Sequence, residues 1–103
     1  MRRATAFIDE HADRDIALVD IAAAAHVTPR RLQYAFRRHL DNTPLGYLRD
    51  VRLRRAQDEL MDADPELTTV TQIAAHWDFL HPGRFATRYQ AVHHCPPSST
   101  LRG

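Results

Sequence analysis

The sequence predicts an all-α protein of about seven helices, arranged as two related halves joined by a long central helix. Three observations predict this fold class. Apolar residues recur at three- and four-residue spacing along most of the 103 residues, and no segment alternates in the way of a half-buried strand. Thr-Pro and His-Pro pairs, which suit helix starts, divide the chain. The second half also repeats the pattern of the first.

The first half contains three predicted helices, over about 3–12, over about 18–25, and from Thr28-Pro29 onward. Thr is a good N-cap residue, and Pro suits the first helical position because the N–H group there has no intrahelical partner. The expected inner-facing residues are Phe7, Ile8 and Ala12 in the first helix, Leu18, Ile21, Ala22 and Ala25 in the second, and Leu32, Ala35, Phe36, His39 and Leu40 in the third.

A second Thr-Pro pair, Thr43-Pro44, opens the longest predicted helix, which ends at about Met61 and precedes a linker over 62–69. Thr69 and Gln72 are spaced as a capping box for a fifth helix. A sixth helix follows His81-Pro82, and a short seventh follows Pro96-Pro97, anchored by Leu101. The expected packing residues are Leu48, Val51, Ala56 and Leu60 in the fourth helix, Val70, Ile73, Ala74 and Trp77 in the fifth, and Phe85, Tyr89 and Val92 in the sixth.

The two halves are offset copies of one pattern. A shift of 52 residues places Ile21-Ala22-Ala23 over Ile73-Ala74-Ala75, and a shift of 53 places Leu32 over Phe85. Each copy consists of a short helix, a tight turn and a longer helix, which is the helix-turn-helix unit. Two copies in register make a chance match improbable.

Composition and charge narrow the function classes. No apolar run approaches the roughly 20 residues of a membrane span, and the lone Cys95 excludes a disulfide framework and a multi-cysteine zinc site, so a cytoplasmic location is expected. The net charge is only +1, but residues 27–57 carry +6 and residues 58–78 carry −6. This separation predicts local anion-binding surfaces.

Several stretches together resemble the DNA-binding domain of AraC/XylS-type transcription regulators: 20–25, 28–38, 43–49, 51–56 and 81–85. The resemblance extends over about residues 3–102. It implies helix-turn-helix subdomains over 3–43 and 62–102, with a connecting helix over 44–61. A helix about 27 Å long could offer two recognition helices to successive major-groove segments about 34 Å apart.

The resemblance also implies the partners and the residues of the site. The partners are double-stranded DNA, RNA polymerase, and a separate N-terminal effector or dimerisation domain; no cofactor is expected. Base edges are assigned to Arg30, Gln33, Tyr34, Gly83, Arg84 and Thr87, and phosphates to Arg31, Arg37, Arg38 and Arg88. Arginine suits guanine and glutamine suits adenine. For Arg49, Arg52 and Arg55 of the connecting helix, phosphate contact and simple solvation stay open.

The sequence departs from the family pattern at four helix-ending turns, where glycine is usual and where it has His26, Asp41, Asp78 and His94. These residues tolerate positive φ better than most, so we expect positive φ at most of the four. The helix starts near Ala17 and Leu80 lack the usual Ser or Thr. Ala91 and Val92 replace basic residues, which makes base recognition by the second copy the weaker expectation.

Other function classes have less support. The sequence has no nucleophile elbow, no glycine-rich phosphate loop and no histidine pair on a helix with a carboxylate between, so no enzyme activity is predicted. A helical protein-interaction module is one alternative. A metal-binding domain is another, with ligands drawn from His76 and His81, or from His93, His94 and Cys95.

Overall fold

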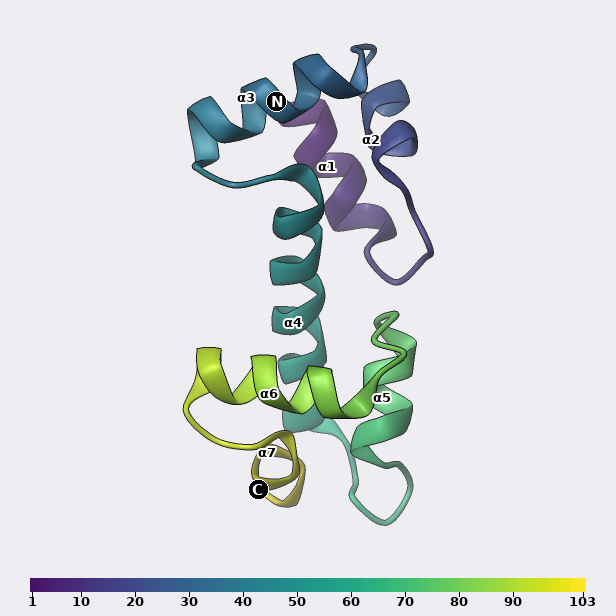
Figure 1. Cartoon of the computed structure of the whole chain (residues 1–103). Helices are drawn as coiled ribbons and strands as arrows, with labels where there is room; N and C mark the ends of the chain where they lie inside the picture. The colour runs from purple at the N-terminus through teal and green to yellow at the C-terminus, as the bar shows by residue number, and fades with distance from the viewer. The chain divides into compact units, whose positions relative to one another are not determined.

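The computed structural model describes all 103 residues, and every regular element in it is a helix. The seven helices are α1 (Arg2–His11), α2 (Leu18–Ala24), α3 (Pro29–Leu40), α4 (Pro44–Asp62), α5 (Val70–His76), α6 (Pro82–His93) and α7 (Pro97–Arg102) (Figure 1). The all-α fold class and the seven helices are thereby confirmed. None of these helices has both the length and the apolar composition that a membrane span requires.

The helices begin where side-chain caps satisfy free N–H groups. The Thr28 side chain accepts a hydrogen bond from the Arg31 N–H (3.2 Å). Thr43 Oγ1 likewise accepts from the Gly46 N–H (2.9 Å). Of the two weak starts, Ala17 has no capping side chain, and Asp20 three residues later accepts from its N–H (2.7 Å).

The predicted capping box of α5 is present. Thr69 Oγ1 accepts from the Gln72 N–H (3.1 Å), and the Gln72 side chain accepts from the Thr69 N–H (3.0 Å). Two donors that have no partner within the helix are therefore satisfied reciprocally.

The chain folds as two compact units, Met1–Val51 and Arg52–Gly103, and the boundary lies within α4. In the first unit, α2 packs against both α1 and α3. Its buried side chains come from all of its helices: Ala4, Ile8, Ala12, Ile21, Ala22, Leu32, Phe36, Leu48 and Val51. This core holds the helix-turn-helix formed by α2 and α3.

The second unit repeats this plan with α5 and α6, which pack against each other and against α7. Its core consists of Leu53, Ala56, Leu60, Ile73, Ala74, Phe85 and Tyr89. Partly buried side chains, among them Trp77, Phe79 and Leu101, close the edge of this core. The longer helix of each motif, α3 or α6, therefore packs through one buried apolar face, and its other face is exposed to solvent.

Three predicted core positions are wrong. His39 and Leu40 at the end of α3 are exposed, because α3 buries only Leu32 and Phe36. Val92 in α6 is 54% exposed. The third position on the packed face of α6 is instead His93, whose ring lies against Tyr89 with centroids 4.4 Å apart. At the end of α3, periodicity gives the face of the helix but does not show how far its neighbours extend. On α6, periodicity does not decide which of the adjacent Val92 and His93 faces the core.

Candidate nucleic-acid interface

The two helix-turn-helix turns have the same backbone hydrogen bonds. In the first, the Val27 N–H donates to the Ala22 carbonyl (3.1 Å) and the His26 N–H to Ala23 (3.1 Å). In the second, Phe79 donates to Ala74 (2.8 Å) and Asp78 to Ala75 (3.0 Å). A bond spanning six residues that encloses a shorter one is typical of a helix ended by a left-handed residue. The repeat seen in the sequence is thus also a repeat of backbone geometry.

The four residues that stand where the family has glycine all have positive φ, as predicted. The values are 58° at His26, 48° at Asp41, 65° at Asp78 and 63° at His94, and no other residue except the terminal Gly103 has positive φ. His26 and Asp78 end the first helix of each motif, while Asp41 and His94 end the second. The alignment of the turns therefore holds for both copies.

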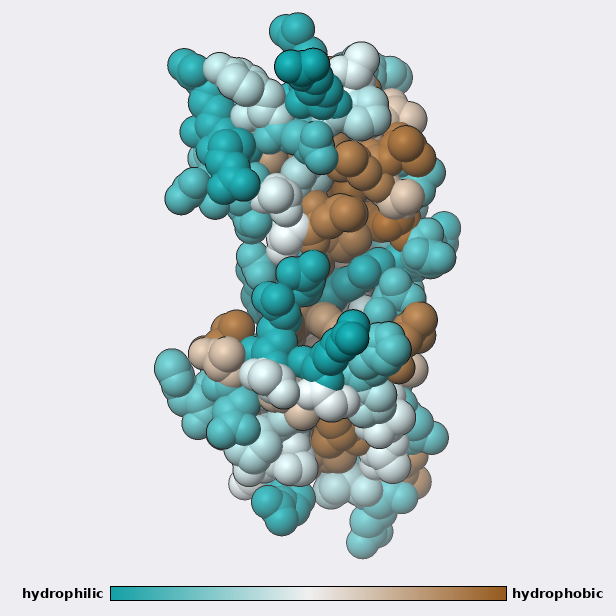
Figure 2. All heavy atoms as spheres, viewed as in Figure 1, coloured by the Kyte–Doolittle hydropathy of each residue, from teal (hydrophilic) through white to brown (hydrophobic).

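The outer face of α3 presents long polar side chains. Leu32 and Phe36 are buried, and the residues assigned to DNA on this helix are all exposed: Arg30, Arg31, Gln33, Tyr34, Arg37 and Arg38. Tyr34 is 65% exposed, and its hydroxyl accepts a hydrogen bond from Arg38 (3.4 Å). Arg37 lies 3.8 Å from Asp41, but both side chains stay well exposed. In the half that contains α3, hydrophilic residues cover the region of this helix (Figure 2).

An open depression of about 590 Å³ runs along the same face of α3, lined by Thr28, Arg30, Arg31, Tyr34, Ala35, Arg38 and His39. Four of its seven lining residues are among those that the sequence assigned to DNA. The structure therefore brings Arg30, Arg31, Tyr34 and Arg38 together on one accessible surface. The guanidinium groups of the three arginines can donate to base edges or to phosphate oxygens.

The corresponding face of α6 is lined by smaller side chains. Gly83, Arg84, Thr87 and Arg88 are all exposed. The Thr87 hydroxyl donates to the Gly83 carbonyl one turn earlier (3.0 Å). Two arginines on this face, against four on α3, leave α6 with fewer long donors.

The arginines of α4 do not behave alike. Arg49 is exposed. Arg52 instead lies 3.5 Å from Asp78, and its side chain is only 13% exposed. The Arg55 guanidinium lies over the Trp77 ring, 6.0 Å from its centroid. Arg52 therefore does not extend into solvent, because it pairs with the carboxylate of the second turn.

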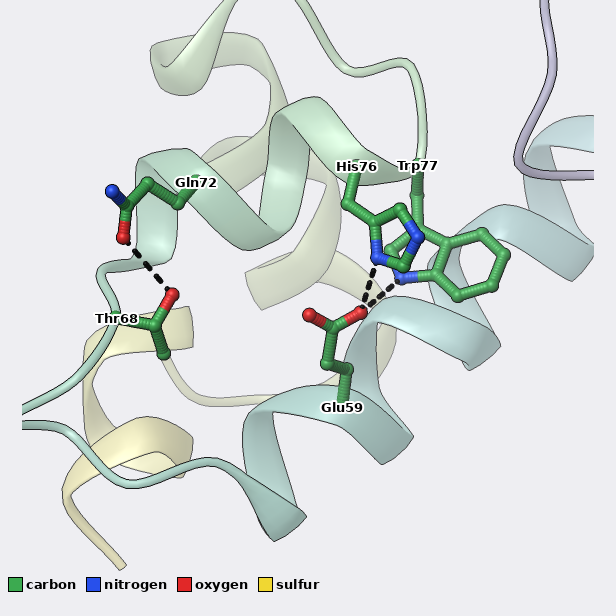
Figure 3. A network of polar contacts seen from close by, with 5 residues as sticks. All are labelled: Glu59, Thr68, Gln72, His76 and Trp77. Carbon is green, nitrogen blue, oxygen red and sulfur yellow. Dashed lines mark hydrogen bonds and ion pairs between the residues drawn. The ribbon is translucent and has the colours of Figure 1, made fainter.

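Sequence reasoning missed a polar network that attaches the end of α5 to α4 (Figure 3). Glu59 Oε1 accepts from the Trp77 indole N–H (2.9 Å) and lies 2.7 Å from His76 Nδ1. Its partners are 17 and 18 residues away in the sequence. No helical spacing links residues so far apart, so periodicity gave no signal for this contact. The network fixes the turn that leads into α6.

A second polar contact fixes the other end of α6. The Tyr89 hydroxyl, inside the core of the second unit, lies 2.7 Å from Thr100 Oγ1. Burial raises the pKa of Tyr89 above its usual value, although the hydrogen bond to Thr100 acts in the opposite direction. This contact ties α6 to α7.

Two of the histidines predicted as alternative metal ligands make other contacts in the structure. His76 contacts Glu59, and the ring of His93 lies tilted against that of Tyr89. No group of three or more His, Cys, Asp or Glu side chains is arranged to hold a metal ion. The structure therefore does not bring His93, His94 and Cys95 together as a ligand set.

Comparison with known proteins gives concordant matches. A family model described as a helix-turn-helix domain matches residues 21–103. The chain is 36% identical to the probable thc operon regulatory protein of Rhodococcus erythropolis, over 99% of this chain and 31% of that protein. It is 37% identical to the XylDLEGF operon transcriptional activator of Pseudomonas putida, over 97% of this chain and 31% of that protein. The chain thus spans about a third of the length of these relatives.

Solved structures also match. A probable AraC family transcriptional regulator from Rhodopseudomonas palustris CGA009 has 31% identity and a TM-score of 0.89, over 98% of this chain and 93% of that one. A regulator from Chromobacterium violaceum, described as an AraC-type DNA-binding domain protein, has the same TM-score at 22% identity, which supports the fold alone.

Proposed function

Because the chain belongs to the AraC/XylS family of transcription regulators and contains its DNA-binding domain, we propose that α3 and α6 are recognition helices that enter the major groove of a specific duplex. The observation that carries this proposal is the duplicated turn, with positive φ at the same place in both motifs. That turn sets the angle between the short helix and the longer helix whose outer face is exposed, and a major groove admits an α-helix.

Base recognition is proposed for residues in the first turns of each longer helix. In α3 these are Arg30, Gln33 and Tyr34, and in α6 they are Gly83, Arg84 and Thr87. Recognition helices of this motif use their N-terminal residues for base edges. Arg30 offers paired donors that suit guanine, and Gln33 offers a donor and an acceptor that suit adenine.

Phosphate contacts are proposed for Arg31, Arg37, Arg38 and Arg88. All four are exposed, and Arg37 and Arg38 lie toward the end of α3, away from the turn that would lead into the groove. Contacts of this kind hold a protein in register on the duplex without reading sequence.

We further propose that the two motifs occupy successive major-groove segments of one site, with subdomains over 3–43 and 62–102 and a connecting segment over 44–61. Support comes from the repeat itself, since each copy has the turn and the exposed helix that groove binding needs. Such a site spans about two helical turns of DNA. Nuclease footprinting of the complex gives the length of DNA that is protected, and protection of a single groove segment would overturn this mode of binding.

The partners beyond DNA are proposed from the family. A regulator of this kind acts through RNA polymerase in the cytoplasm, where the bacterial chromosome lies, and commonly under the control of an effector or dimerisation domain. The relatives of which the chain spans about a third include a transcriptional activator, which supports an activating role.

Selection of bound fragments from random or genomic DNA tests the proposed function. We expect the protein to bind the selected duplex about a thousandfold more tightly than a scrambled duplex at physiological salt. Arg30→Ala should reduce this preference by about 1–3 kcal/mol, while Arg102→Ala, which removes an exposed charge from α7, should keep it. Equal affinity for selected and scrambled DNA would refute sequence-specific binding.

A further inference from the structure

Two glycines lie inside helices, Gly46 and Gly83. At Gly46, neighbouring side chains of the protein itself explain why glycine is needed. An added Cβ at Gly46 would lie 2.3 Å from the Asn42 side-chain oxygen and 2.9 Å from Thr43 Oγ1. These two side chains shape the start of α4, where Thr43 caps the Gly46 N–H. The side chain is absent there because the cap occupies its space.

At Gly83, no neighbouring atom of the protein requires glycine. A Cβ built there meets no atom within 4 Å, and φ at this position is not positive. Glycine is also the poorest helix former after proline, so its presence in the first turn of α6 does not help the helix. The fold would accept a side chain at this position, so packing within the protein does not require the glycine. Gly83 is exposed on the helix that the proposed function places in the groove.

Thr87, one turn further along α6, faces the same way as Gly83. Its hydroxyl donates to the Gly83 carbonyl at 3.0 Å, so the hydroxyl proton is already used within the helix. What remains for a ligand is the γ-methyl group and an oxygen that can accept. The equivalent positions on α3, Arg30 and Tyr34, carry long side chains instead. The side chains at Gly83 and Thr87 thus offer space, a methyl group and an acceptor oxygen, but no free donor.

We propose that Gly83 and Thr87 read the C5 methyl group of a thymine in the half-site bound by α6. This inference rests on the proposed function. Thymine is the only base whose major-groove edge carries a methyl group, and apolar contact with that group distinguishes it. The missing side chain of Gly83 leaves space for the methyl group, and the Thr87 methyl supplies an apolar contact.

Replacement of each thymine in the selected duplex by deoxyuridine, which lacks only the methyl group, tests the proposal. At one position in the α6 half-site we expect wild-type affinity to fall about three- to fivefold, as the loss of one buried methyl group predicts. The Gly83→Ala variant should bind the thymine duplex about tenfold more weakly, because its Cβ overlaps the methyl group. It should bind the deoxyuridine duplex better than the thymine duplex, reversing the preference.

Variants of Thr87 separate the methyl group from the hydroxyl. Thr87→Val keeps the methyl group and should retain the thymine preference, whereas Thr87→Ser keeps the hydroxyl and should lose it. Gly83→Ala should melt at the same temperature as the wild type or higher, which shows that its binding defect does not arise from misfolding. Gly46→Ala, by contrast, should lower the melting temperature.

The outcomes distinguish this inference from the proposed function. If the selected duplex is bound no better than a scrambled one, the proposed function fails. If selective binding holds but deoxyuridine has no effect in the α6 half-site, or affects wild type and Gly83→Ala equally, the thymine assignment is wrong.

Discussion

At the scale of single residues, the four helix-ending turns combine backbone strain with charge. An L-residue in the left-handed region costs roughly 1–2 kcal/mol, and Asp and His are among the residues that tolerate it best. A cation also suits a helix C-terminus, and an anion does not. The negative charge of Asp78 at the end of α5 is unfavourable for this reason, but Asp78 lies 3.5 Å from Arg52 and the ion pair offsets its charge. The His26 backbone N–H donates to the Ala23 carbonyl, and its side chain makes no hydrogen bond or ion pair.

Because the side chain of His26 has no ion pair and that of Asp78 does, the same substitution should affect the two turns differently. His26→Gly should stabilise the protein by about 1 kcal/mol or less, because relief of strain is partly offset by the greater freedom of glycine in the unfolded chain. The melting temperature should rise by several degrees, about 4–8 °C per kcal/mol in a domain of this size. His26→Ala, which keeps a Cβ at the same φ, is the control and should not be stabilised.

At Asp78 the same substitution should have the opposite sign. Asp78→Gly relieves strain, but it also removes the ion pair between Asp78 and the Arg52 side chain, which is only 13% exposed. Loss of one partner from a poorly exposed pair is costly because the other charge remains poorly solvated. Thermal melting checks the prediction, and stabilisation at Asp78 as large as that at His26 would show that the pair contributes nothing.

The pKa of Tyr89 gives a prediction about alkaline pH. Burial raises this pKa above the usual value near 10, so the folded state holds the phenol proton more tightly than the unfolded chain does. The resulting stabilisation is complete below pH 10 and is lost as the pH rises through the raised pKa. Tyr89→Phe should cost about 1 kcal/mol at neutral pH through loss of the hydrogen bond to Thr100. Its difference from wild type in melting temperature should shrink as the pH rises above 10, and a constant difference would show that the phenol proton is not held more tightly in the folded state.

At the scale of elements, helix starts were predictable because their signals are local. The caps at Thr28, Thr43 and Thr69 need only residues three positions apart. Which of Val92 and His93 packs against the core was not predictable, since both lie near the face that contains Phe85 and only the neighbouring side chains decide between them. The contacts of Glu59 were invisible for a related reason, because they join residues from different helices. The exposed face of α3 followed from periodicity, whereas the capture of Arg52 by Asp78 needed the structure.

The Glu59 network predicts how α4 supports the second motif. Glu59→Ala leaves the partly buried Trp77 N–H without its acceptor, which should destabilise the protein by about 1–3 kcal/mol. Because Trp77 is the only tryptophan, its fluorescence reports unfolding of the second unit directly. Asp58→Ala removes an exposed neighbouring carboxylate and serves as the control. Equal melting curves for the two variants would show that the network is not stabilising.

The two recognition helices should contribute unequally. With its long donors, α3 should account for more base discrimination than α6, so Arg30→Ala and Gln33→Ala should each relax preference at particular base pairs by about 1–3 kcal/mol. Arg84→Ala and Thr87→Ala should relax it less. Affinities for a panel of duplexes with single base-pair changes measure this. Greater loss from the α6 variants would reverse the ranking of the halves.

At the scale of the whole molecule, the net charge of +1 gives no reason to expect binding to a polyanion, but the distribution of charge does. Residues 27–57, which include α3, carry +6, and residues 58–78 carry −6. Exposed charges farther apart than about 8–10 Å are screened at physiological salt, so the local excess matters more than the total. Attraction to DNA should therefore depend on individual arginines.

The salt dependence of DNA binding tests whether individual arginines, and not the net charge, determine the affinity. Four proposed phosphate contacts, by Arg31, Arg37, Arg38 and Arg88, predict that the logarithm of affinity falls against the logarithm of salt concentration with a slope of about −3 to −4. Arg37→Ala should weaken binding to all sequences alike and reduce the slope by about 1. Arg102→Ala makes the same change in net charge on α7 and should leave the slope unchanged, because a phosphate contact releases counterions only where it forms. If both variants changed the slope equally, binding would follow the total charge and the assignment of phosphate contacts to these side chains would be wrong.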